Sequence, residues 1–307
     1  MRNAPKFHTP YDGSSKPFTI GLSPLDLKDW IEVDKNLTAY LDEKLNLYRS
    51  LPEKVLVSDE GTEAAQEEVF ELLRAHLLTY FPEIYVADGS SLSLRHPGLR
   101  RDDELKGSLR NAAIARAALL VQEDLVLMRK SAEGWRLVAA SLCFPSAWNL
   151  LEKFRKPLHD IHQPVPSFGV RTRNASMIER IFDNLQVDQP VLRWNWSLHD
   201  DMKLYHPHSN SGPGRRFGGG DLRGQVFIRL ERQTLRRLPK SGDILFTIRI
   251  QVDPLEVLEK HPDGASLALA IDAQLGEMSI DQLDYKGLTG ERTRLSTRLK
   301  QIGNTTL

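Results

Sequence analysis

DILFTIRIQV, residues 243–252, indicates the fold class of this 307-residue chain. Ile244, Phe246, Ile248 and Ile250 recur at every second position, which places them on one face of an extended chain. Alternation of this kind is typical of a β-strand with one buried face. Two earlier runs, VLRWNWSL at 191–198 and QVFIRLERQTL at 225–235, are also strand-like. Three neighbouring strands are therefore predicted in the second half of the chain.

A second group of strands is predicted upstream of these three. EDLVLMRK at 123–130 and WRLVAASLCF at 135–144 flank the turn SAEG, a pattern that favours a hairpin. Helical patterns fill 145–162 and 175–185 between the two groups. This order does not alternate strand and helix, so a parallel sheet is disfavoured. We expect an α+β fold in which an antiparallel five-stranded sheet is covered on one face by the intervening helices.

Helices are also predicted on both sides of this core. Apolar residues recur at helical spacing over 25–51 and 61–83, after an irregular arm rich in Pro, Gly and Ser. The tail at 278–303 has a solvated helical pattern. We therefore divide the chain into an N-terminal arm with helices (1–120), a core (121–255) and a C-terminal helical extension (256–307), expected to form one compact unit.

Composition narrows the possible partners and the cellular compartment. Forty-one basic residues balance forty-one acidic ones, so no overall field favours nucleic acid or an anionic membrane. No stretch approaches the roughly 18 apolar residues of a membrane span, and the first residues lack a signal-peptide pattern. The single cysteine, Cys143, permits no internal disulfide and no multi-thiolate metal site. A cytoplasmic protein is expected.

The segment KPLHDIHQPVP, residues 156–166, carries two candidate metal ligands between prolines. Pro157 restrains the entry, and Pro164 and Pro166 restrain the exit, so His159 and His162 lose little freedom on binding. A neutral imidazole is a good ligand for iron or zinc. The alternative is a histidine that only interacts with the dipole at a helix C-terminus.

A dense set of charges lies in the strand region RLERQTLRRLPKSGDILFTIRI. Glu231 and Arg232 are adjacent on a strand and so point to opposite faces. At least one of them must lie on the covered side, where an unpaired charge is costly. A ligand of opposite charge is one partner that such a residue would require, and an internal ion pair is the other.

Three further patterns are weaker. His199, His206 and His208 resemble a zinc triplet but lie around a polar loop with no acid at ligand spacing. FGGGDLRG at 217–224 lacks the lysine and the Ser or Thr of a P-loop. Cys143 lies in an apolar strand-like run, which favours an inert buried thiol over a haem thiolate.

Four motifs together resemble a known family. VQEDLVLM, CFPSAWNLLEKFRKPLHDIHQPVP, RWNWSL and ERQTLRRLPKSGDILFTIR, spread over about 121–253, are similar to the alpha subunit of haem-dependent oxidative N-demethylases. The resemblance implies a PAS-like fold, non-covalent haem b and an enzyme that is a monooxygenase. It also implies that a small secondary amine such as dimethylamine is converted to the shorter amine and formaldehyde.

The resemblance also suggests residue roles. It makes His162 the axial ligand of the haem iron, since it matches the motif better than His159. From the chemistry of the site, Arg232, Arg236 and Arg237 are candidates to neutralise the haem propionates. Glu231 is the candidate catalytic residue that holds a protonated dialkylammonium near the iron.

A partner protein that supplies electrons is predicted, because the sequence lacks the motifs of the cofactors that would carry them. O2 chemistry of this kind consumes two electrons, yet the sequence contains no dinucleotide fingerprint and no set of cysteines for a cluster. The resemblance implies an NADPH-dependent reductase whose flavin and iron–sulfur cluster lie on partner subunits. Because the net charge is zero, any electrostatic steering of this partner is expected from a local patch such as Arg215 and Arg216. The alternative function is a haem-based gas sensor or a non-catalytic ligand-binding module with a PAS-like fold.

Overall fold

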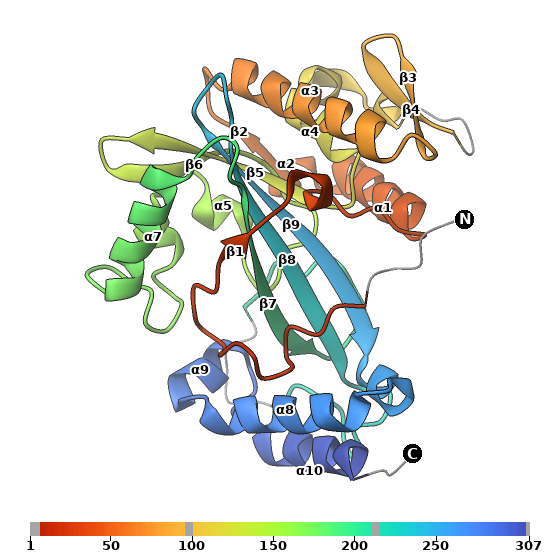
Figure 1. The fold of residues 1–307 in the computed structure, drawn as a ribbon, viewed down its shortest axis with the longest axis vertical. Coiled ribbons are helices and arrows are strands. Elements are labelled where there is room, and N and C mark those ends of the chain that lie inside the picture. Colours follow the sequence, from red (N-terminus) through yellow and green to blue (C-terminus); the bar gives the residue numbers. More distant parts are fainter. Residues whose placement is uncertain (1–6, 96–100, 210–214, 305–307) are drawn as a thin grey trace.

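The computed structural model describes residues 7–95, 101–209 and 215–304, and an antiparallel sheet runs through the centre of the molecule (Figure 1). The sheet has seven strands in the order β1-β7-β8-β9-β5-β6-β2. These strands are β1 (Ser23–Pro24), β2 (Leu56–Ser58), β5 (Asp124–Ser131), β6 (Gly134–Ser141), β7 (Val191–His199), β8 (Phe227–Arg237) and β9 (Ile244–Pro254). The mixed helix and strand content with an antiparallel sheet confirms the predicted fold class.

The number of strands corrects the prediction. All five expected strands form and are adjacent, as β7-β8-β9-β5-β6. Two very short strands from the N-terminal part, β1 and β2, extend the sheet at its two edges. A five-stranded PAS-like sheet is therefore not what the structure shows. Segments of two or three residues are too short to display a period of two, so the sequence could not reveal them.

One face of the sheet is covered by N-terminal helices that pack on β5, β6 and β9, as in the upper part of Figure 1. Its apolar layer includes Trp30, Leu73, Leu125 and Leu127, all essentially buried. The elements are η1 (Leu27–Asp29), the first part of α1 (Leu37–Ser50), α3 (Glu63–Tyr80), the hairpin β3 (Tyr85–Asp88) and β4 (Ser91–Leu94), and α4 (Ala113–Ala118). Between these in the chain are α2 (Pro52–Val55), η2 (Asp102–Glu104) and η3 (Gly107–Asn111), of which α2 and η3 contribute Val55 and Leu109 to a second apolar cluster. We call this side of the sheet the packed face.

The helix expected from residue 25 begins only at Leu37. The backbone N–H groups of Glu32 and Asp34 donate instead to the side chains of Glu123 and Gln122, each at 3.1 Å. Side-chain acceptors thus take up backbone donors that a helix would have used.

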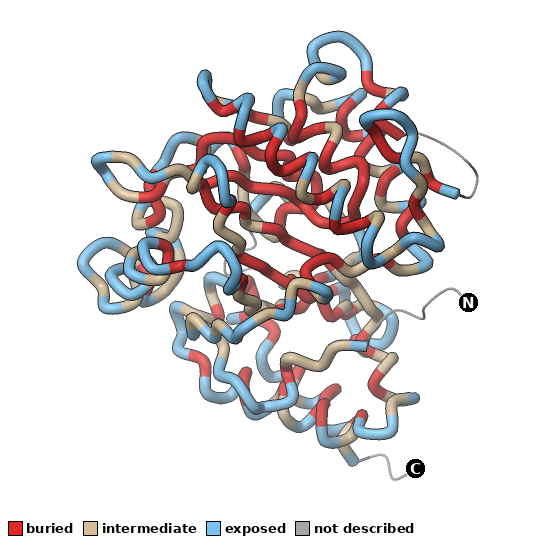
Figure 2. Tube along the Cα trace, turned by 45° about the horizontal axis from the view of Figure 1, so that its top comes forward, coloured by how far each residue is buried: buried red, intermediate tan, exposed pale blue. Residues whose placement is uncertain are grey.

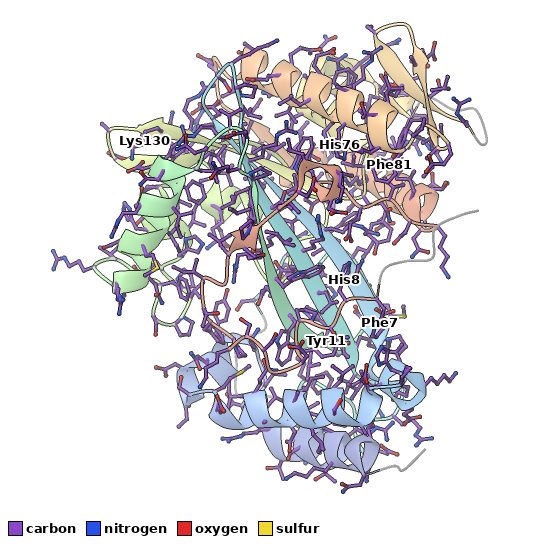
Figure 3. The ribbon with its side chains drawn as sticks, viewed as in Figure 1. Phe7, His8, Tyr11, His76, Phe81 and Lys130 are labelled. Carbon is purple, nitrogen blue, oxygen red and sulfur yellow. The ribbon has the colours of Figure 1, made fainter. Side chains whose placement is uncertain are left out.

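The C-terminal helices close one end of the sheet, at the bottom of Figure 1. They are η4 (Leu255–Lys260), α8 (Gly264–Glu277), α9 (Ile280–Tyr285) and α10 (Arg292–Gly303). They form an apolar cluster with Trp196, Leu198 and Ile228 of β7 and β8. The N-terminal segment lies along the same strands, where the ring of His8 is 4.4 Å from that of Trp194 (Figure 3).

The opposite side of the sheet is covered by residues 145–185, which we call the cap. It contains α5 (Leu150–Lys153), α6 (Leu158–Ile161) and α7 (Arg173–Asn184). Unlike the packed layer, its residues are mostly exposed or half-buried (Figure 2). Among the described residues, no helix is both long and apolar enough to cross a membrane.

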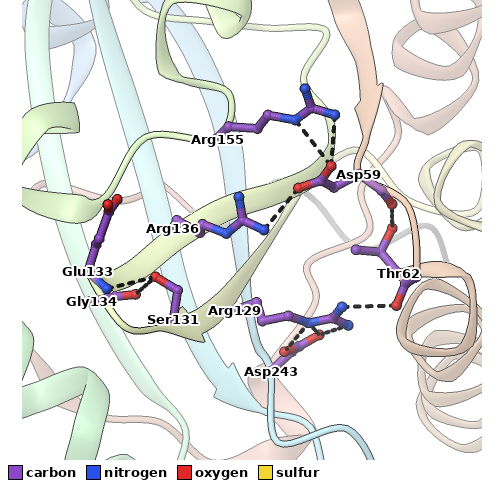
Figure 4. Close-up of polar contacts among 10 residues, drawn as sticks. Asp59, Thr62, Arg129, Ser131, Glu133, Gly134, Arg136, Arg155 and Asp243 are labelled. Atoms are coloured by element: carbon purple, nitrogen blue, oxygen red, sulfur yellow. Dashed lines mark hydrogen bonds and ion pairs between the residues drawn. The ribbon is translucent and has the colours of Figure 1, made fainter.

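An ion-pair cluster fixes the cap to the rest of the molecule (Figure 4). Arg155, between α5 and α6, and Arg136 of β6 both reach the Asp59 carboxylate, at 2.8 and 3.1 Å. The Arg155 N–H also donates to the Leu137 carbonyl. Arg155 has a φ of +64°, a left-handed conformation that costs about 1 kcal/mol or more in a non-glycine residue. These contacts hold that turn in place.

Candidate functional site

A cavity of about 270 Å³ lies between the sheet and the cap. A single buried water needs only roughly 10–15 Å³ on the same measure, so this is a space for a ligand rather than a packing defect. The cap supplies one wall and the sheet supplies the other. Residues 18–22, which we call the strap, and Tyr285 and Lys286 complete it.

The sheet wall is divided into an apolar and a polar half. Val126, Met128, Phe246 and Ile248 of β5 and β9 form the apolar half. The polar half is formed by β7 and β8, whose alternating residues point the same way: Arg193, Asn195, Ser197 and His199 on β7, and Glu231 and Gln233 on β8. The cavity therefore suits an amphiphilic ligand.

Glu231, the candidate substrate-binding residue, lies in the centre of the polar half. Its side chain is nearly buried, with 6 % exposure. One carboxylate oxygen accepts from Asn195 Nδ2 at 3.0 Å and the other from Gln233 Nε2 at 2.7 Å. Both bonds come from neutral amides, so they fix the carboxylate and leave its charge in place.

Two cations line the cavity near this carboxylate. Arg193 donates to Gln233 Oε1 at 2.8 Å and to the backbone carbonyls of Thr19 and Ile20 in the strap. Lys286 donates to the Trp196 carbonyl at 2.7 Å. Burial lowers the pKa of Lys286 to about 8, against the raising effect of Glu231. The polar half is thus rich in positive charge around one carboxylate.

His162 lines the cavity from the cap, at the C-terminus of α6. Its Nδ1 lies 2.9 Å from the Leu158 carbonyl, which can only accept, so the proton is on Nδ1 and Nε2 keeps a free lone pair. Burial lowers the pKa of His162 to about 4, which keeps the ring neutral near pH 7. These are the properties of a metal-ligating imidazole.

The turn after His162 is ordered by local contacts. The Val165 N–H donates to the His162 carbonyl at 2.9 Å, and Lys153 Nζ donates to the Ile161 carbonyl. His159 is different: a third of its side chain is exposed, its Nε2 lies 3.5 Å from Asp160, and it does not line the cavity. The two histidines of the segment thus occupy different environments.

None of the three arginines expected at the haem propionates lines the cavity. Arg232 points to the packed face, where it donates to the carbonyls of Trp30 and Asp29 and pairs with Glu32 at 3.3 Å. Arg236, on the same face, lies over the Trp30 ring at 4.3 Å. Strand alternation explains both positions, since even-numbered residues of β8 point away from Glu231.

Arg237 points to the cavity side but lies beyond the cavity. Its guanidinium donates to the carbonyls of Leu185 and Phe182 at 2.6 and 2.7 Å, and it is not among the lining residues. Arg193 and Lys286 are the cations that reach the polar half, and neither was predicted as a site residue from the sequence. Arg193 could have been found from RWNWSLH, in which polar residues alternate with Trp194, Trp196 and Leu198.

Cys143 is buried, as expected, and does not line the cavity. Burial raises its pKa well above the usual thiol value. The described residues contain no group of three or more His, Cys, Asp or Glu arranged to hold a metal ion. A haem iron, which takes only one or two protein ligands, would not require such a group.

The sequence matches a protein-family model over most of its length. The family is described as haem-dependent oxidative N-demethylase, alpha subunit-like, and the match covers residues 21–295. This match is longer than the stretch of about 121–253 that carries the quoted motifs. It includes the end of the strap, the cap, the strands that line the cavity and the segment around Lys286.

Proposed function

The chain belongs to the haem-dependent oxidative N-demethylase alpha-subunit-like family, and from that premise we propose that it oxidatively demethylates a small secondary amine such as dimethylamine. The cofactor is haem b, held without covalent bonds in the cavity under the cap. The observation that supports this most is His162, a neutral imidazole with a free Nε2 at an amphiphilic cavity. Haem would fit this cavity because its apolar ring matches the apolar half of the sheet wall and its two charged propionates match the polar half.

His162 is the proposed axial ligand of the haem iron. The bond from its Nδ1 to the Leu158 carbonyl orients the ring and increases the basicity of Nε2. His159 is the reserve candidate, but nothing directs its ring into the cavity. When bound, the haem supplies the O2 activation, while the protein sets ligation, polarity and substrate position.

Arg193 and Lys286 are the proposed partners of the haem propionates, in place of Arg232, Arg236 and Arg237. They line the polar half of the cavity, opposite the apolar residues of β5 and β9. A guanidinium can form paired hydrogen bonds with a carboxylate, and an ammonium can act as a point charge. Arg193 would exchange its bonds with the strap for bonds to a propionate.

Glu231 is the proposed anchor of the substrate ammonium. The amides of Asn195 and Gln233 hold its carboxylate without neutralising it. A dialkylammonium brought to the carboxylate would gain a charge-assisted hydrogen bond. The alternative is that Arg193 and Lys286 already satisfy Glu231, which would then be part of a structural ion network.

The overall reaction consumes protons and electrons as well as O2. For dimethylamine it is (CH3)2NH + O2 + 2e⁻ + 2H⁺ → CH3NH2 + CH2O + H2O. The electrons must be supplied by another protein, and we propose an NADPH-dependent reductase with flavin and an iron–sulfur cluster on partner subunits. Of the patch expected to dock it, Arg216 is mostly buried and donates to the Lys286 carbonyl, whereas Arg215 is exposed.

Reconstitution tests this function. The haem-loaded chain is mixed with NADPH, O2 and dimethylamine, and formaldehyde is measured with and without the reductase subunits. We expect no formaldehyde from the chain alone and stoichiometric formaldehyde and methylamine when the reductase is present. Haem binding without any amine-dependent product in the complete mixture would instead favour a sensor or a ligand-binding module. Turnover by the chain alone with NADPH would contradict the partner requirement.

A further inference from the structure

Four polar side chains form a row from the cavity towards solvent. Ser197 and His199 line the cavity, and His199 Nε2 lies 3.0 Å from Ser197 Oγ. The His206 ring lies next, with its centroid 4.8 Å from that of His199 and the two rings edge to face. His206 Nε2 is 3.0 Å from Asp201 Oδ1. Exposure rises along the row, from 1 % for His199 to 15 % for the His206 side chain and 36 % for that of Asp201.

The fold brings these groups together from two segments. Ser197 and His199 are two apart on β7, so both point to the cavity side of the sheet. His206 belongs to the loop after β7, and its backbone pairs with the start of the cap: its N–H donates to the Pro145 carbonyl and its carbonyl accepts from Ala147. This pairing fixes the His206 ring beside His199.

Arg229 also holds this region in place, through hydrogen bonds from the protein interior. It is fully buried and donates to Ser146 Oγ and to the carbonyls of Phe144, Pro145, Lys203 and Leu204. The loop that carries Asp201 and His206 is therefore tied to the protein interior at several points. Such an arrangement is preorganised, since the groups of the row lose little freedom when they act together.

The surroundings keep His199 uncharged. Burial, first, and then the charges of Arg216, Arg229 and Lys286 lower the pKa of His199 far below the usual value. Its Nδ1 is buried and has no hydrogen-bond partner. A buried nitrogen without a partner is costly, so His199 Nδ1 would gain from accepting a proton or a hydrogen bond.

We propose that Asp201, His206, His199 and Ser197 conduct protons from solvent into the cavity. This inference rests on the proposed function only for the use of the protons, because demethylation consumes two of them per O2. The row would supply these protons through the sheet wall, on the side of the cavity formed by β7. Neutral imidazoles suit this task, since each ring accepts a proton on one nitrogen and releases one from the other.

In the proposed transfer, each group accepts one proton and releases one proton. Water protonates Asp201, which passes the proton to His206 Nε2 and returns to a carboxylate. His206 then releases the proton of its other nitrogen to His199, through a bridging water or a ring rotation across the 4.8 Å gap. His199 releases its own proton to Ser197 Oγ, whose hydroxyl proton enters the cavity. One proton has moved inward, and rotation of the hydroxyl and exchange of the tautomers reset the row.

The experiment measures this route directly, with the full chain. Protein labelled with ¹⁵N-histidine is examined by NMR, and the exchange of the His199 ring proton with water is measured without haem. We expect His206→Gln and Asp201→Asn to slow this exchange about tenfold or more. Asn at position 201 keeps the oxygen that accepts from the Lys203 N–H, so the loop should stay folded. His208→Gln, at an exposed site of the same loop, is the matched control and should leave the exchange unchanged.

A second measurement connects the route to the reaction. In the reconstituted enzyme, Asp201→Asn should lower the formaldehyde formed per O2 consumed and increase the solvent isotope effect, while His208→Gln changes neither. Exchange rates equal in wild type, Asp201→Asn and His206→Gln would overturn the proposal, whatever the activity. A chain without demethylase activity but with slowed exchange in these variants would contradict the proposed function and keep the route.

Discussion

Glu231 and Arg232 are neighbours on β8, yet they lie in two different kinds of environment. Glu231 faces an open cavity, held by two neutral amides. Arg232 faces the packed layer, where carbonyls and the Glu32 carboxylate surround its guanidinium. The packed face uses buried charges to hold segments together, whereas the cavity face leaves charges next to space. Charges of the first kind should matter for stability, and charges of the second kind for ligand binding.

The largest effect is expected from Arg232→Met. Removing this guanidinium leaves Glu32 with one partner fewer and takes one donor from each of two carbonyls, which should cost about 3–5 kcal/mol of unfolding free energy. Urea denaturation measures this. Variants that still fold should bind haem in unchanged amount. A loss of haem from a stable Arg232→Met protein would show that the packed face also serves the cofactor.

The second largest effect is expected on the unfolding free energy at acid pH. His76 lies in the packed layer, where burial and then Arg236 lower its pKa to about 4 (Figure 3). The unfolded chain, with a pKa near 6.5, therefore takes up a proton first as the pH falls. The neutral ring makes its full contribution to the unfolding free energy above about pH 6.5. This contribution, at most about 3 kcal/mol, is lost as the pH falls towards 4.

His76→Leu should accordingly flatten the stability profile between pH 6.5 and 4, as measured by urea unfolding at each pH. His208→Leu, at an exposed site, is the control and should keep the wild-type slope. An equal slope in all three proteins would mean that acid sensitivity arises outside the packed face.

A matched pair of arginines separates the cavity from its surroundings. Arg193 donates to strap carbonyls inside the cavity, and Arg237 donates to the carbonyls of Leu185 and Phe182 outside it. Each Arg→Gln change should cost about 1–3 kcal/mol of stability. Only Arg193→Gln should also weaken haem binding, by roughly tenfold. Equal haem affinity in both variants would remove Arg193 from the cofactor site.

The smallest stability effect is expected from Glu231→Gln. The substitution keeps the shape but replaces one of the two accepting oxygens by an NH2 that faces a donating amide, so the unfolding free energy should fall by about 1 kcal/mol. Amine binding, followed through the haem absorption bands, should weaken about tenfold while haem content stays constant. A marked loss of stability with unchanged amine affinity would identify Glu231 as part of a structural ion network.

The sequence predicted the strands better than the faces on which their residues lie. Alternation in 243–252 and in the runs before it located all five central strands, because period-two patterns are local. Which face would carry a cavity depended on distant segments: the helices around Trp30 fill one side, and the cap leaves space on the other. Glu231 and His162, both predicted as site residues, line the cavity. Arg232 and Arg236, predicted with them, point to the packed face instead.

Other site residues had no local signal. Lys286 reaches the cavity from the end of α9, more than fifty residues after Glu231. The row from Ser197 to Asp201 depends on the pairing of the His206 backbone with Pro145 and Ala147, which no spacing in the sequence indicates. The strap is also set by tertiary contacts, through Arg193.

We propose that the cavity face binds haem through His162. The most direct test is haem titration of the purified apoprotein by absorption spectroscopy, for wild type, His162→Ala and His159→Ala. The account predicts one haem per chain for wild type and for His159→Ala, with the same ferric and ferrous–CO spectra. His162→Ala should bind much less haem or show an altered spectrum. Full haem loading of His162→Ala with an unchanged spectrum, together with loss in His159→Ala, would contradict it.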